Sequence, residues 1–388
     1  MPVKASGVSS LTWARRPLGE QPYDLVVGSP GPIRAALIGY GLAGRVFHAP
    51  LISTTPGMRL TTVVTANPDR QAGAARDNPD VRVLESAAPL WQVAEDHDVV
   101  IVAAPNRTHV SLAHAGLDAG LAVVVDKPIA PTADEGRSLV EFARRRGRLL
   151  TVFHNRRWDA EILTLRRLLA DGVLGSVVRL ESRFDRWRPH VSPGWRDSAD
   201  QSDAGGLLLD LGSHLVDQVL HLFGRPDRVY AEVDARRPGA RADDDIFVAL
   251  GYSSGLKVHL WASVLAAAPT TRLRCVGLDG TYVRDRLDVQ EDALRTGKRP
   301  TDASWGREPP ELWGRIVDDS GSRPVESEPG AWPRFYVELV AALRGEGPVP
   351  VRPEEAVAAL EVIDAARQSV TEGSVVRLGE PASAVMPR

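Results

Sequence analysis

IRAALIGYGLAG, residues 33–44, is an apolar run that ends in three glycines and leads into a segment compatible with a helix. In this spacing Gly39 permits a tight turn out of a strand, Gly41 lets the backbone approach a pyrophosphate, and Gly44 lets the next helix pack closely against the strand. That helix would present free amides and the positive end of its dipole to a phosphate. The stretch favours a dinucleotide cradle, but Gly-rich turns are common, so the rest of the chain has to decide.

Size and charge narrow the class of protein. At 388 residues with 43% hydrophobic content, the chain is long enough for about two domains with separate cores. Its 47 basic and 50 acidic residues give a net charge of -3, which offers no broad field to nucleic acid or to an anionic membrane surface. The single cysteine, Cys275, excludes an internal disulfide and a CxxC-type zinc site, so we expect no metal and a reducing compartment.

Residues 1–31 are rich in Pro, Gly and Ser and lack hydrophobic periodicity, so we expect a poorly ordered extension. Arg15 and Arg16 form a twin-arginine pair, but charges and prolines follow them in place of the apolar stretch of an export signal. No window of the sequence approaches the roughly 18 apolar residues of a membrane span. The expected location is the cytoplasm.

Residues 32–153 alternate short apolar runs with helical patterns, which is typical of a parallel sheet with crossover helices. The predicted fold class is therefore α/β, a doubly wound Rossmann domain. Ligands of such sheets lie beyond the carboxyl ends of the strands. The loops expected at those ends are 39–44, 65–67, 104–106 and 126–128.

Residues 154–388 change to longer alternating runs, which predict an α+β domain with a large, mostly antiparallel open sheet. A single helix over 209–223 is expected to interrupt the strands, and two more are expected at 332–343 and 353–370. Residues 284–330 are dense in Asp, Arg, Pro and Gly, and we expect them to form a long surface excursion.

The predicted helix 209–223 carries four ionisable residues on one face: Asp210, His214, Asp217 and His221. A carboxylate one turn from an imidazole can orient the ring and raise its pKa, which suits a general acid or base. The alternative is structural: Asp210 as an N-cap, Asp217 and His221 as solvated side chains, and His214 as a satisfied core histidine.

Asp126, Lys127 and Pro128 follow the apolar run LAVVV, at the edge where a doubly wound sheet meets its ligand. A lysine amine beside a nicotinamide ring could donate a hydrogen bond to a substrate oxygen and relay its proton. A surface lysine that flanks a strand is the alternative.

The choice between NADP and NAD depends on the end of the second strand. An Asp or Glu there would hold the ribose hydroxyls of NAD, but the residues present are Thr65, Ala66 and Asn67. Arg70, just beyond them, could meet an added 2′-phosphate. NADP is therefore favoured over NAD.

Four motifs together resemble the Gfo/Idh/MocA oxidoreductases, the group that contains glucose-fructose oxidoreductase and inositol dehydrogenases: GYGLAG at 39–44, APNRTH at 104–109, DKP at 126–128 and GGLLLDLGSHLVDQ at 205–218. GRVFHAP at 44–50, FHNRRWD at 153–159 and QEDALRTGKRP at 290–300 resemble the NADP-dependent scyllo-inositol dehydrogenase branch of that family. The usual EKP of the family is DKP here, which keeps the lysine.

The resemblance implies a two-domain enzyme whose second domain, 154–388, binds substrate and forms a homodimer or homotetramer through its open sheet. It places the catalytic lysine, aspartate and histidine on Lys127, Asp210 and His214, with Asn155, Arg156, Trp195 and Arg196 as further substrate contacts. The implied cofactor contacts are Gly39, Tyr40, Gly41, Leu42, Ala43, Gly44, Thr65, Ala66, Asn67, Arg70, Pro105, Asn106, His109, Asp126, Lys127 and Pro128.

The expected activity is hydride transfer between NADP and a secondary alcohol of a sugar or cyclitol. Two alternatives stay open. One is a sensor that binds dinucleotide or sugar without catalysis, and the other is a reductase of a non-sugar ketone. A basic and aromatic set would line a different pocket in the latter case or lie on the sheet surface: Arg183, Arg186, Trp187, Arg188, Trp195 and Arg196.

Overall fold

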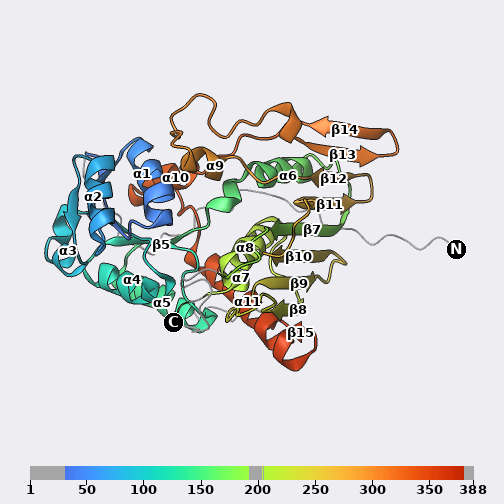
Figure 1. The fold of residues 1–388 in the computed structure, drawn as a ribbon, viewed down its shortest axis with the longest axis horizontal. Helices are drawn as coiled ribbons and strands as arrows, with labels where there is room; N and C mark the ends of the chain where they lie inside the picture. The colour runs from blue at the N-terminus through green and yellow to red at the C-terminus, as the bar shows by residue number, and fades with distance from the viewer. Residues whose placement is uncertain (1–30, 192–202, 204, 380–388) are drawn as a thin grey trace.

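The computed structural model describes residues 31–191, 203 and 205–379 (Figure 1). The expected extension at residues 1–31 lies almost wholly outside this range, as do Trp195 and Arg196. Two sheets make up the chain, and helices from the C-terminal part pack against both of them. In the part described, no helix has the length and apolarity needed to cross a bilayer.

The first sheet confirms the doubly wound prediction. Its six strands are parallel and follow the order β3-β2-β1-β4-β5-β6. The central strands β1, β4 and β5 are apolar and buried except at Arg34 and Asp126, as expected where helices cover both faces. The strands are β1 (Ile33–Ile38), β2 (Met58–Val64), β3 (Arg82–Leu84), β4 (Val99–Val102), β5 (Ala122–Asp126) and β6 (Leu150–Phe153).

Helices connect these strands: η1 (Ala43–His48), α1 (Ala49–Thr54), α2 (Pro68–Asp77), α3 (Ala88–Gln92), η2 (Ala94–Asp96), η3 (Asn106–Thr108), α4 (His109–Asp118) and α5 (Ala133–Arg146). The helix after the glycines starts as a π-helix, η1, where the sequence favours a regular helix. Pro50 has no N–H to donate to the carbonyl four residues back, and the Ala49 N–H instead reaches Gly44 O.

The second sheet has nine strands in the order β14-β13-β12-β11-β7-β10-β9-β8-β15. All neighbours are antiparallel except β7 and β10, so the mostly antiparallel prediction is confirmed. The strands are β7 (Val177–Asp185), β8 (Arg228–Asp234), β9 (Asp245–Gly251), β10 (Lys257–Ser263), β11 (Leu273–Gly277), β12 (Thr281–Arg284), β13 (Gly314–Asp318), β14 (Gly321–Val325) and β15 (Val376–Arg377).

Residues in β7, β9 and β10 alternate between buried and partly exposed, so one face of this sheet packs on helices. The helices are η4 (Asn155–Trp158), α6 (Ala160–Ala170), α7 (Leu207–Asp210), α8 (Gly212–Phe223), α9 (Gln290–Arg295), η7 (Pro310–Leu312), α10 (Pro333–Leu343) and α11 (Pro353–Glu372). In Figure 1, α8 and α11 cover the face that looks toward the first sheet.

Two sequence predictions are wrong in this half. The predicted helix 209–223 is split at Leu211 into α7 and α8. At the break, Lys127 Nζ donates a hydrogen bond to the main-chain carbonyl oxygen of Asp210. The predicted excursion 284–330 instead contributes α9 and the hairpin β13–β14, which extends the sheet. Its polar composition hid the strands because β14 is an edge strand whose side chains are mostly exposed.

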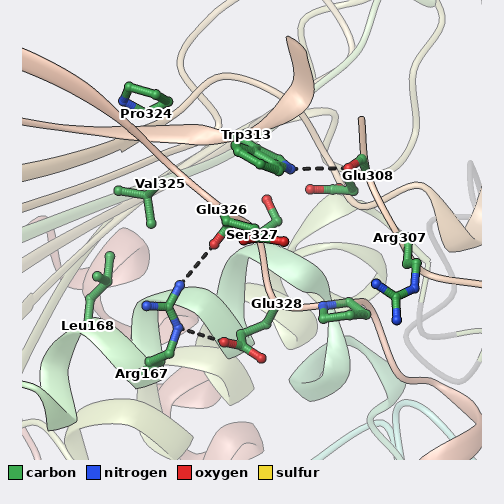
Figure 2. A pocket seen from close by; sticks show the side chains of 11 residues that line it. Arg167, Leu168, Arg307, Glu308, Trp313, Pro324, Val325, Glu326, Ser327 and Glu328 are labelled. Atoms are coloured by element: carbon green, nitrogen blue, oxygen red, sulfur yellow. Dashed lines mark hydrogen bonds and ion pairs between the residues drawn. The ribbon is translucent and has the colours of Figure 1, made fainter. Parts of the chain in front are cut away.

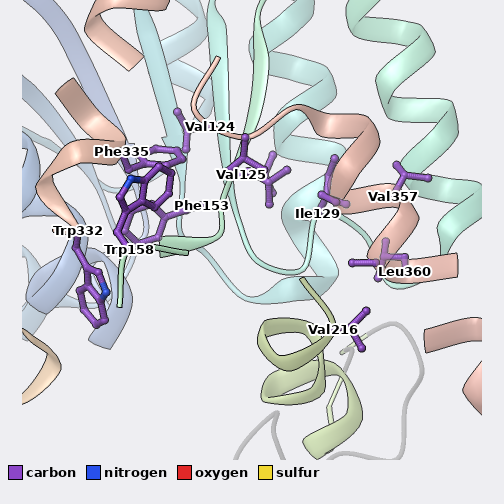
Figure 3. Close-up of a cluster of buried hydrophobic side chains, with 14 of the residues drawn as sticks. Val124, Val125, Ile129, Phe153, Trp158, Val216, Trp332, Phe335, Val357 and Leu360 are labelled. Carbon is purple, nitrogen blue, oxygen red and sulfur yellow. The ribbon is translucent and has the colours of Figure 1, made fainter. Parts of the chain in front are cut away.

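The two sheets are joined by a common core in which side chains of β5, β6, α10 and α11 meet (Figure 3). Phe153 of β6 stacks edge-on against Phe335 of α10, with ring centroids 4.9 Å apart. Thr151 donates a hydrogen bond to Val351 O at 2.7 Å, and Asp364 of α11 accepts one from the Ala133 N–H at 2.9 Å. The C-terminal helices therefore fix the second sheet against the first.

Candidate functional site

Two of the three glycines after β1, Gly39 and Gly44, sit where no larger residue fits. Gly39 has φ +102°, and a Cβ there would lie 2.3 Å from Ala103 O. A Cβ at Gly44 would lie 1.9 Å from Gly39 O. A Cβ at Gly41 would meet only the Arg70 guanidinium, in ordinary contact with Nη1 at 3.7 Å. Gly39 and Gly44 thus shape the turn, while Gly41 leaves its backbone accessible to a ligand.

The loop after β2, residues 65–67, carries no carboxylate, and Arg70 lies just beyond it. Asn67 caps α2 because its Oδ1 accepts a hydrogen bond from the Arg70 N–H at 3.0 Å. The Arg70 guanidinium lies over Gly41. Gln71 donates to Thr65 O at 2.8 Å and so fixes the end of the strand. Thr65, Ala66, Asn67 and Arg70 therefore form one side of the cradle.

His109 ties the loops after β4 and β5 together. Its ring is buried, with Nδ1 2.8 Å from Pro128 O and Nε2 2.9 Å from Ala104 O. Pro105 and Asn106 form the turn between these contacts, and Asn106 is buried. Burial lowers the pKa of His109. The sequence predicted that His109 contacts the cofactor. In the structure its side chain contacts the main chain of the loops after β4 and β5.

Tyr40 differs from its neighbours in the cradle. Its ring is 2% exposed, and its hydroxyl accepts a hydrogen bond from Asn78 at 2.9 Å and donates one to Asp77 at 3.3 Å. Burial raises the pKa of Tyr40 to about 12. The side chain therefore packs against α2, and only the backbone of Tyr40 belongs to the loop.

A pocket of about 280 Å³ lies where this cradle meets α8. It brings together eight of the predicted site residues: Leu42, Ala43, Asp126, Lys127, Asn155, Arg156, Asp210 and His214. Its other lining residues are Phe47, Phe153, Arg186, Arg188, Leu211, Glu291, Arg295 and Trp332. Residues from both sheets thus converge on one cavity at the carboxyl ends of the parallel strands.

Lys127 and Asp210 form the central ion pair of the pocket. Lys127 Nζ lies 2.8 Å from Asp210 Oδ1 and 2.5 Å from Asp210 O, and each side chain is less than one-fifth exposed. The break between α7 and α8 lets Asp210 present its carbonyl and its carboxylate to the same amine. Lys127 is therefore held at the end of β5 by a residue 83 positions away.

His214 is buried, and its Nδ1 has no hydrogen-bond partner. Burial lowers the pKa of His214 well below 6.5, and the nearby cations of Lys127 and Arg156 lower it further. The expectation that Asp210 raises the pKa of His214 is therefore wrong, because the Asp210 carboxylate is paired with Lys127 and burial dominates. At neutral pH the imidazole is uncharged and able to accept a proton.

Asp217 and His221 are structural rather than solvated. Arg157 donates three hydrogen bonds to Asp217: Nη2 to Oδ1 at 2.6 Å, and Nε to Oδ2 at 2.9 Å and to Oδ1 at 3.2 Å. Burial would raise the pKa of Asp217, but Arg157 and His154 bring it below its ordinary value. Burial lowers the pKa of His221 to about 4. The stripe of ionisable residues therefore serves two purposes: Asp210 and His214 line the pocket, and Asp217 ties α8 to η4.

Arg156 is anchored at the pocket wall. Its Nη2 lies 2.6 Å from Glu291 Oε2, and its guanidinium stacks over the rings of Phe184 and Trp332 at 5.0 and 5.7 Å. Glu291 and Arg295 come from α9, inside the predicted excursion, so composition hid them. The QEDALRTGKRP motif already contained both residues and was the signal that could have found them.

A second layer connects the cradle to β5. His48 of η1 is fully buried, and its Nδ1 lies 2.6 Å from the Tyr336 hydroxyl while its Nε2 lies 3.7 Å from Asp126 Oδ2. Burial raises the pKa of Asp126, but His48 and Lys127 lower it more, so the net shift is downward. Asp126 is therefore ionised beside Lys127.

A larger cavity, of about 700 Å³, lies away from these residues, between α6 and the loops around β14 (Figure 2). Arg167 there pairs with Glu328 at 2.6 Å and donates to Glu326 O at 2.9 Å, while Trp313 donates to Glu308 O at 3.1 Å. None of the predicted site residues lines it. Among the described residues, no cluster of His, Cys, Asp and Glu is arranged to hold a metal ion.

Known proteins match both halves of this chain. Residues 33–154 match the Gfo/Idh/MocA model described as "Oxidoreductase family, NAD-binding Rossmann fold", and residues 166–378 match its "C-terminal alpha/beta domain". The uncharacterised oxidoreductase YdgJ of Escherichia coli is 39% identical over 336 residues, which cover 86% of this chain and 94% of YdgJ.

Bacillus subtilis provides two further matches. The scyllo-inositol 2-dehydrogenase (NADP(+)) IolW is 35% identical over 352 residues, covering 89% of this chain and 96% of IolW. The solved structure of the oxidoreductase yvaA superposes with a TM-score of 0.84 at 33% identity, covering 91% of this chain and 99% of that chain.

Proposed function

Since this chain belongs to the Gfo/Idh/MocA oxidoreductase family, we propose that it is an NADP-dependent dehydrogenase of a sugar or cyclitol, acting on a secondary alcohol and reversibly on the ketone. The family resemblance of its motifs is confirmed by these matches. The observation that carries the proposed activity is the pocket in which the Lys127–Asp210 pair and the uncharged, buried His214 stand beside the glycine cradle.

The cradle fits a dinucleotide. Only the Arg70 guanidinium lies close to the place of a Cβ at Gly41, and the loops after β1, β2, β4 and β5 meet at one edge of the sheet. When bound, NADP supplies a nicotinamide C4 that accepts a hydride. Lys127, Asp126 and Leu42 line the pocket next to the cradle, so the reacting end of the cofactor belongs there.

His214 and Lys127 divide the work on the substrate hydroxyl. His214 removes the hydroxyl proton as the hydride leaves the same carbon, and its lowered pKa keeps it able to accept that proton at neutral pH. Lys127 Nζ donates a hydrogen bond to the reacting oxygen. Asp210 positions the Lys127 amine through its carboxylate and its carbonyl oxygen. In the reverse direction His214 returns the proton to the ketone oxygen.

The preference for NADP over NAD rests on Arg70. A 2′-phosphate on the adenosine ribose would accept charge-assisted hydrogen bonds from Arg70. Residues 65–67 contain no carboxylate that would repel this phosphate. Arg70→Gln is expected to lower kcat/KM for NADP about tenfold to a hundredfold and to leave NAD unchanged. Arg76→Gln, an exposed arginine on the same helix, is the control. Equal losses with both cofactors would contradict the assignment.

Residues 154–388 are proposed to carry the oligomer contact on the outer face of the second sheet. Phe247 and Trp261 stack there with centroids 5.2 Å apart, Arg183 lies 3.7 Å over Trp261, and Trp187 is 57% exposed. Such an aromatic patch suits a homodimer or homotetramer. Light scattering of Trp261→Glu should show smaller particles than the unchanged chain, and a monomeric unchanged chain would rule the contact out.

The activity is tested by turnover with NADP and NAD against scyllo-inositol, myo-inositol, glucose and related sugars, followed by absorbance of the reduced nicotinamide. His214→Gln is expected to lose about a hundredfold to ten-thousandfold in kcat. His221→Gln, on the same helix and outside the pocket, should keep full activity. Tight NADP binding without turnover of any sugar or cyclitol would favour a sensor or a reductase of another ketone.

A further inference from the structure

Arg186 and Arg188 extend the substrate pocket beyond the residues of the proposed chemistry. Both line it, while Trp187 between them is 57% exposed, as expected of an extended segment whose alternate side chains face opposite ways. Arg186 is half-buried and Arg188 is exposed. Neither residue has an assigned role in hydride transfer.

The backbone of this segment is fixed. The Arg186 N–H donates to Ser263 O at 2.8 Å, and the Arg188 N–H donates to Val264 O at 2.7 Å. Arg237, itself paired with Asp244 at 2.8 Å, donates to His190 O at 3.1 Å. The two guanidinium groups are therefore carried by a pre-organised element, which suits recognition of a ligand.

The other cations of the pocket are neutralised by its carboxylates. Lys127 pairs with Asp210 at 2.8 Å, and Arg156 and Arg295 share Glu291 at 2.6 and 2.8 Å. Across the described residues, no hydrogen bond or ion pair joins the guanidinium of Arg186 or Arg188 to the protein. The pocket's described lining residues include five cations, the other three being Lys127, Arg156 and Arg295, but only three carboxylates, Asp126, Asp210 and Glu291, so positive charge is in excess and the two unpaired guanidinium groups carry it.

A half-buried guanidinium without a partner calls for an anion. Burial lowers the pKa of Arg186, with Arg156 and Arg188 adding to the effect and Glu291 and Asp210 opposing it. A guanidinium nevertheless stays protonated in proteins, so its unmet donors remain in the pocket. Carboxylate and phosphate match the planar fork of arginine with two parallel hydrogen bonds. A neutral polyol would satisfy these donors with single, weaker bonds.

We propose that Arg186 and Arg188 form a subsite for an anionic group of the substrate, a carboxylate or a phosphate, so that the preferred substrate is a sugar acid or a sugar phosphate. This inference rests on the proposed dehydrogenase function. The reacting hydroxyl lies at Lys127 and His214, and the anionic group of the same molecule lies at the arginines. A pocket of about 280 Å³ suits a molecule of roughly monosaccharide size.

Binding is measured first, because it does not require turnover. Protein loaded with NADPH cannot oxidise an alcohol, so nicotinamide fluorescence reports dead-end binding of glucose, myo-inositol, glucuronate, glucose 6-phosphate and inositol 1-phosphate. At least one anionic ligand is expected to bind about tenfold or more tightly than its neutral counterpart, with an affinity that falls as salt rises. The uronate and phosphate arms distinguish the two anion sources.

Variants then localise the effect. Arg186→Gln is expected to weaken the anionic ligand about tenfold to a hundredfold and to leave the neutral counterpart within about twofold. Arg186→Lys should recover part of the loss, because it keeps the charge but not the fork. Arg188→Gln should have a smaller effect, since exposed charges are screened. Arg59→Gln, exposed on β2, is the matched control and should change nothing.

The outcomes separate this inference from the proposed function. If neutral ligands bind as tightly as every anionic one, or if Arg186→Gln weakens both classes equally, the anionic subsite is wrong even where a neutral sugar turns over. If an anionic ligand binds through Arg186 but no alcohol is oxidised, the subsite stands and the dehydrogenase assignment fails.

Discussion

Two cavities of this molecule, the one beside Arg167 and the one at Lys127, differ most in how their charges are satisfied. In the larger one, about 700 Å³, the Arg167 guanidinium is paired with the Glu328 carboxylate and Trp313 donates to Glu308 O. The smaller one, about 280 Å³, holds His214, whose Nδ1 has no hydrogen-bond partner, and Arg186, whose guanidinium forms no hydrogen bond or ion pair within the described part of the chain. Unmet polar groups cost free energy in a folded protein and persist where a ligand can satisfy them, so the charge arrangement, not the volume, is our reason for proposing the smaller cavity as the site.

The contrast between the two cavities is tested most strongly by replacing Lys127, the cation of the central ion pair in the smaller cavity. Lys127→Met is expected to lower kcat about a hundredfold to ten-thousandfold, because the reacting oxygen loses its hydrogen-bond donor and Asp210 loses its partner. Trp313→Phe in the larger cavity should leave kcat unchanged. Steady-state kinetics on the same substrate measures kcat for both variants. A large fall in kcat for Trp313→Phe would contradict the assignment of the chemistry to the smaller cavity.

The buried ion pair beneath the smaller cavity should dominate stability. Asp217→Asn leaves the Arg157 guanidinium, 5% exposed, with Glu355 as its remaining carboxylate. The free energy of unfolding is expected to fall by about 3 kcal/mol, because breaking a buried pair strands a charge. Urea unfolding monitored by circular dichroism measures this value. A change below about 1 kcal/mol would show that Glu355 and water compensate fully.

The pH dependence of stability should reveal the buried histidine on α8. The pKa of His221 is about 4 in the folded protein and 6.5 ordinarily, so between these values the unfolded chain binds more protons. Stability is therefore lost as pH falls below 6.5. Between about pH 7 and pH 5, the free energy of unfolding of His221→Gln should fall by about 1–2 kcal/mol less than that of the unchanged chain. Parallel stability curves for both proteins would contradict the burial of His221.

The smallest effect is expected at the exposed ion pair of the larger cavity. Arg167 and Glu328 are 38% and 41% exposed, so solvent screens their attraction. Glu328→Gln should change the free energy of unfolding by less than about 1 kcal/mol and leave turnover intact. Thermal unfolding at low and high salt checks this prediction, and a loss as large as that of Asp217→Asn would remove the contrast between the two cavities.

Much of the fold was predictable because its signals are local. The apolar runs of residues 32–153 identified all six parallel strands, and the glycine spacing identified the turn after β1. Lys127 could be singled out because it follows a buried run at the functional edge of such a sheet. The strands β13 and β14 were missed because an edge hairpin with exposed side chains has the composition of a loop.

Parts of the site were not predictable from the sequence, since they depend on contacts between distant segments. Spacing indicated that Asp210 faces His214, but the break at Leu211 turns Asp210 toward Lys127, 83 positions away. Glu291 reaches Arg156 across 135 positions, and nothing in the local pattern of either residue indicates this pair.

The sequence by itself determined the doubly wound sheet, the glycine cradle and the identity of the candidate residues Lys127, Asp210 and His214, because hydrophobic period and glycine geometry act over a few neighbouring residues. Only the tertiary structure decided which charges are paired and which are not. Burial and the approach of cations from other elements made His214 uncharged, and within the described residues no carboxylate forms an ion pair with Arg186. Electrostatic free energy depends on distances through space, and those distances exist only once the chain has folded.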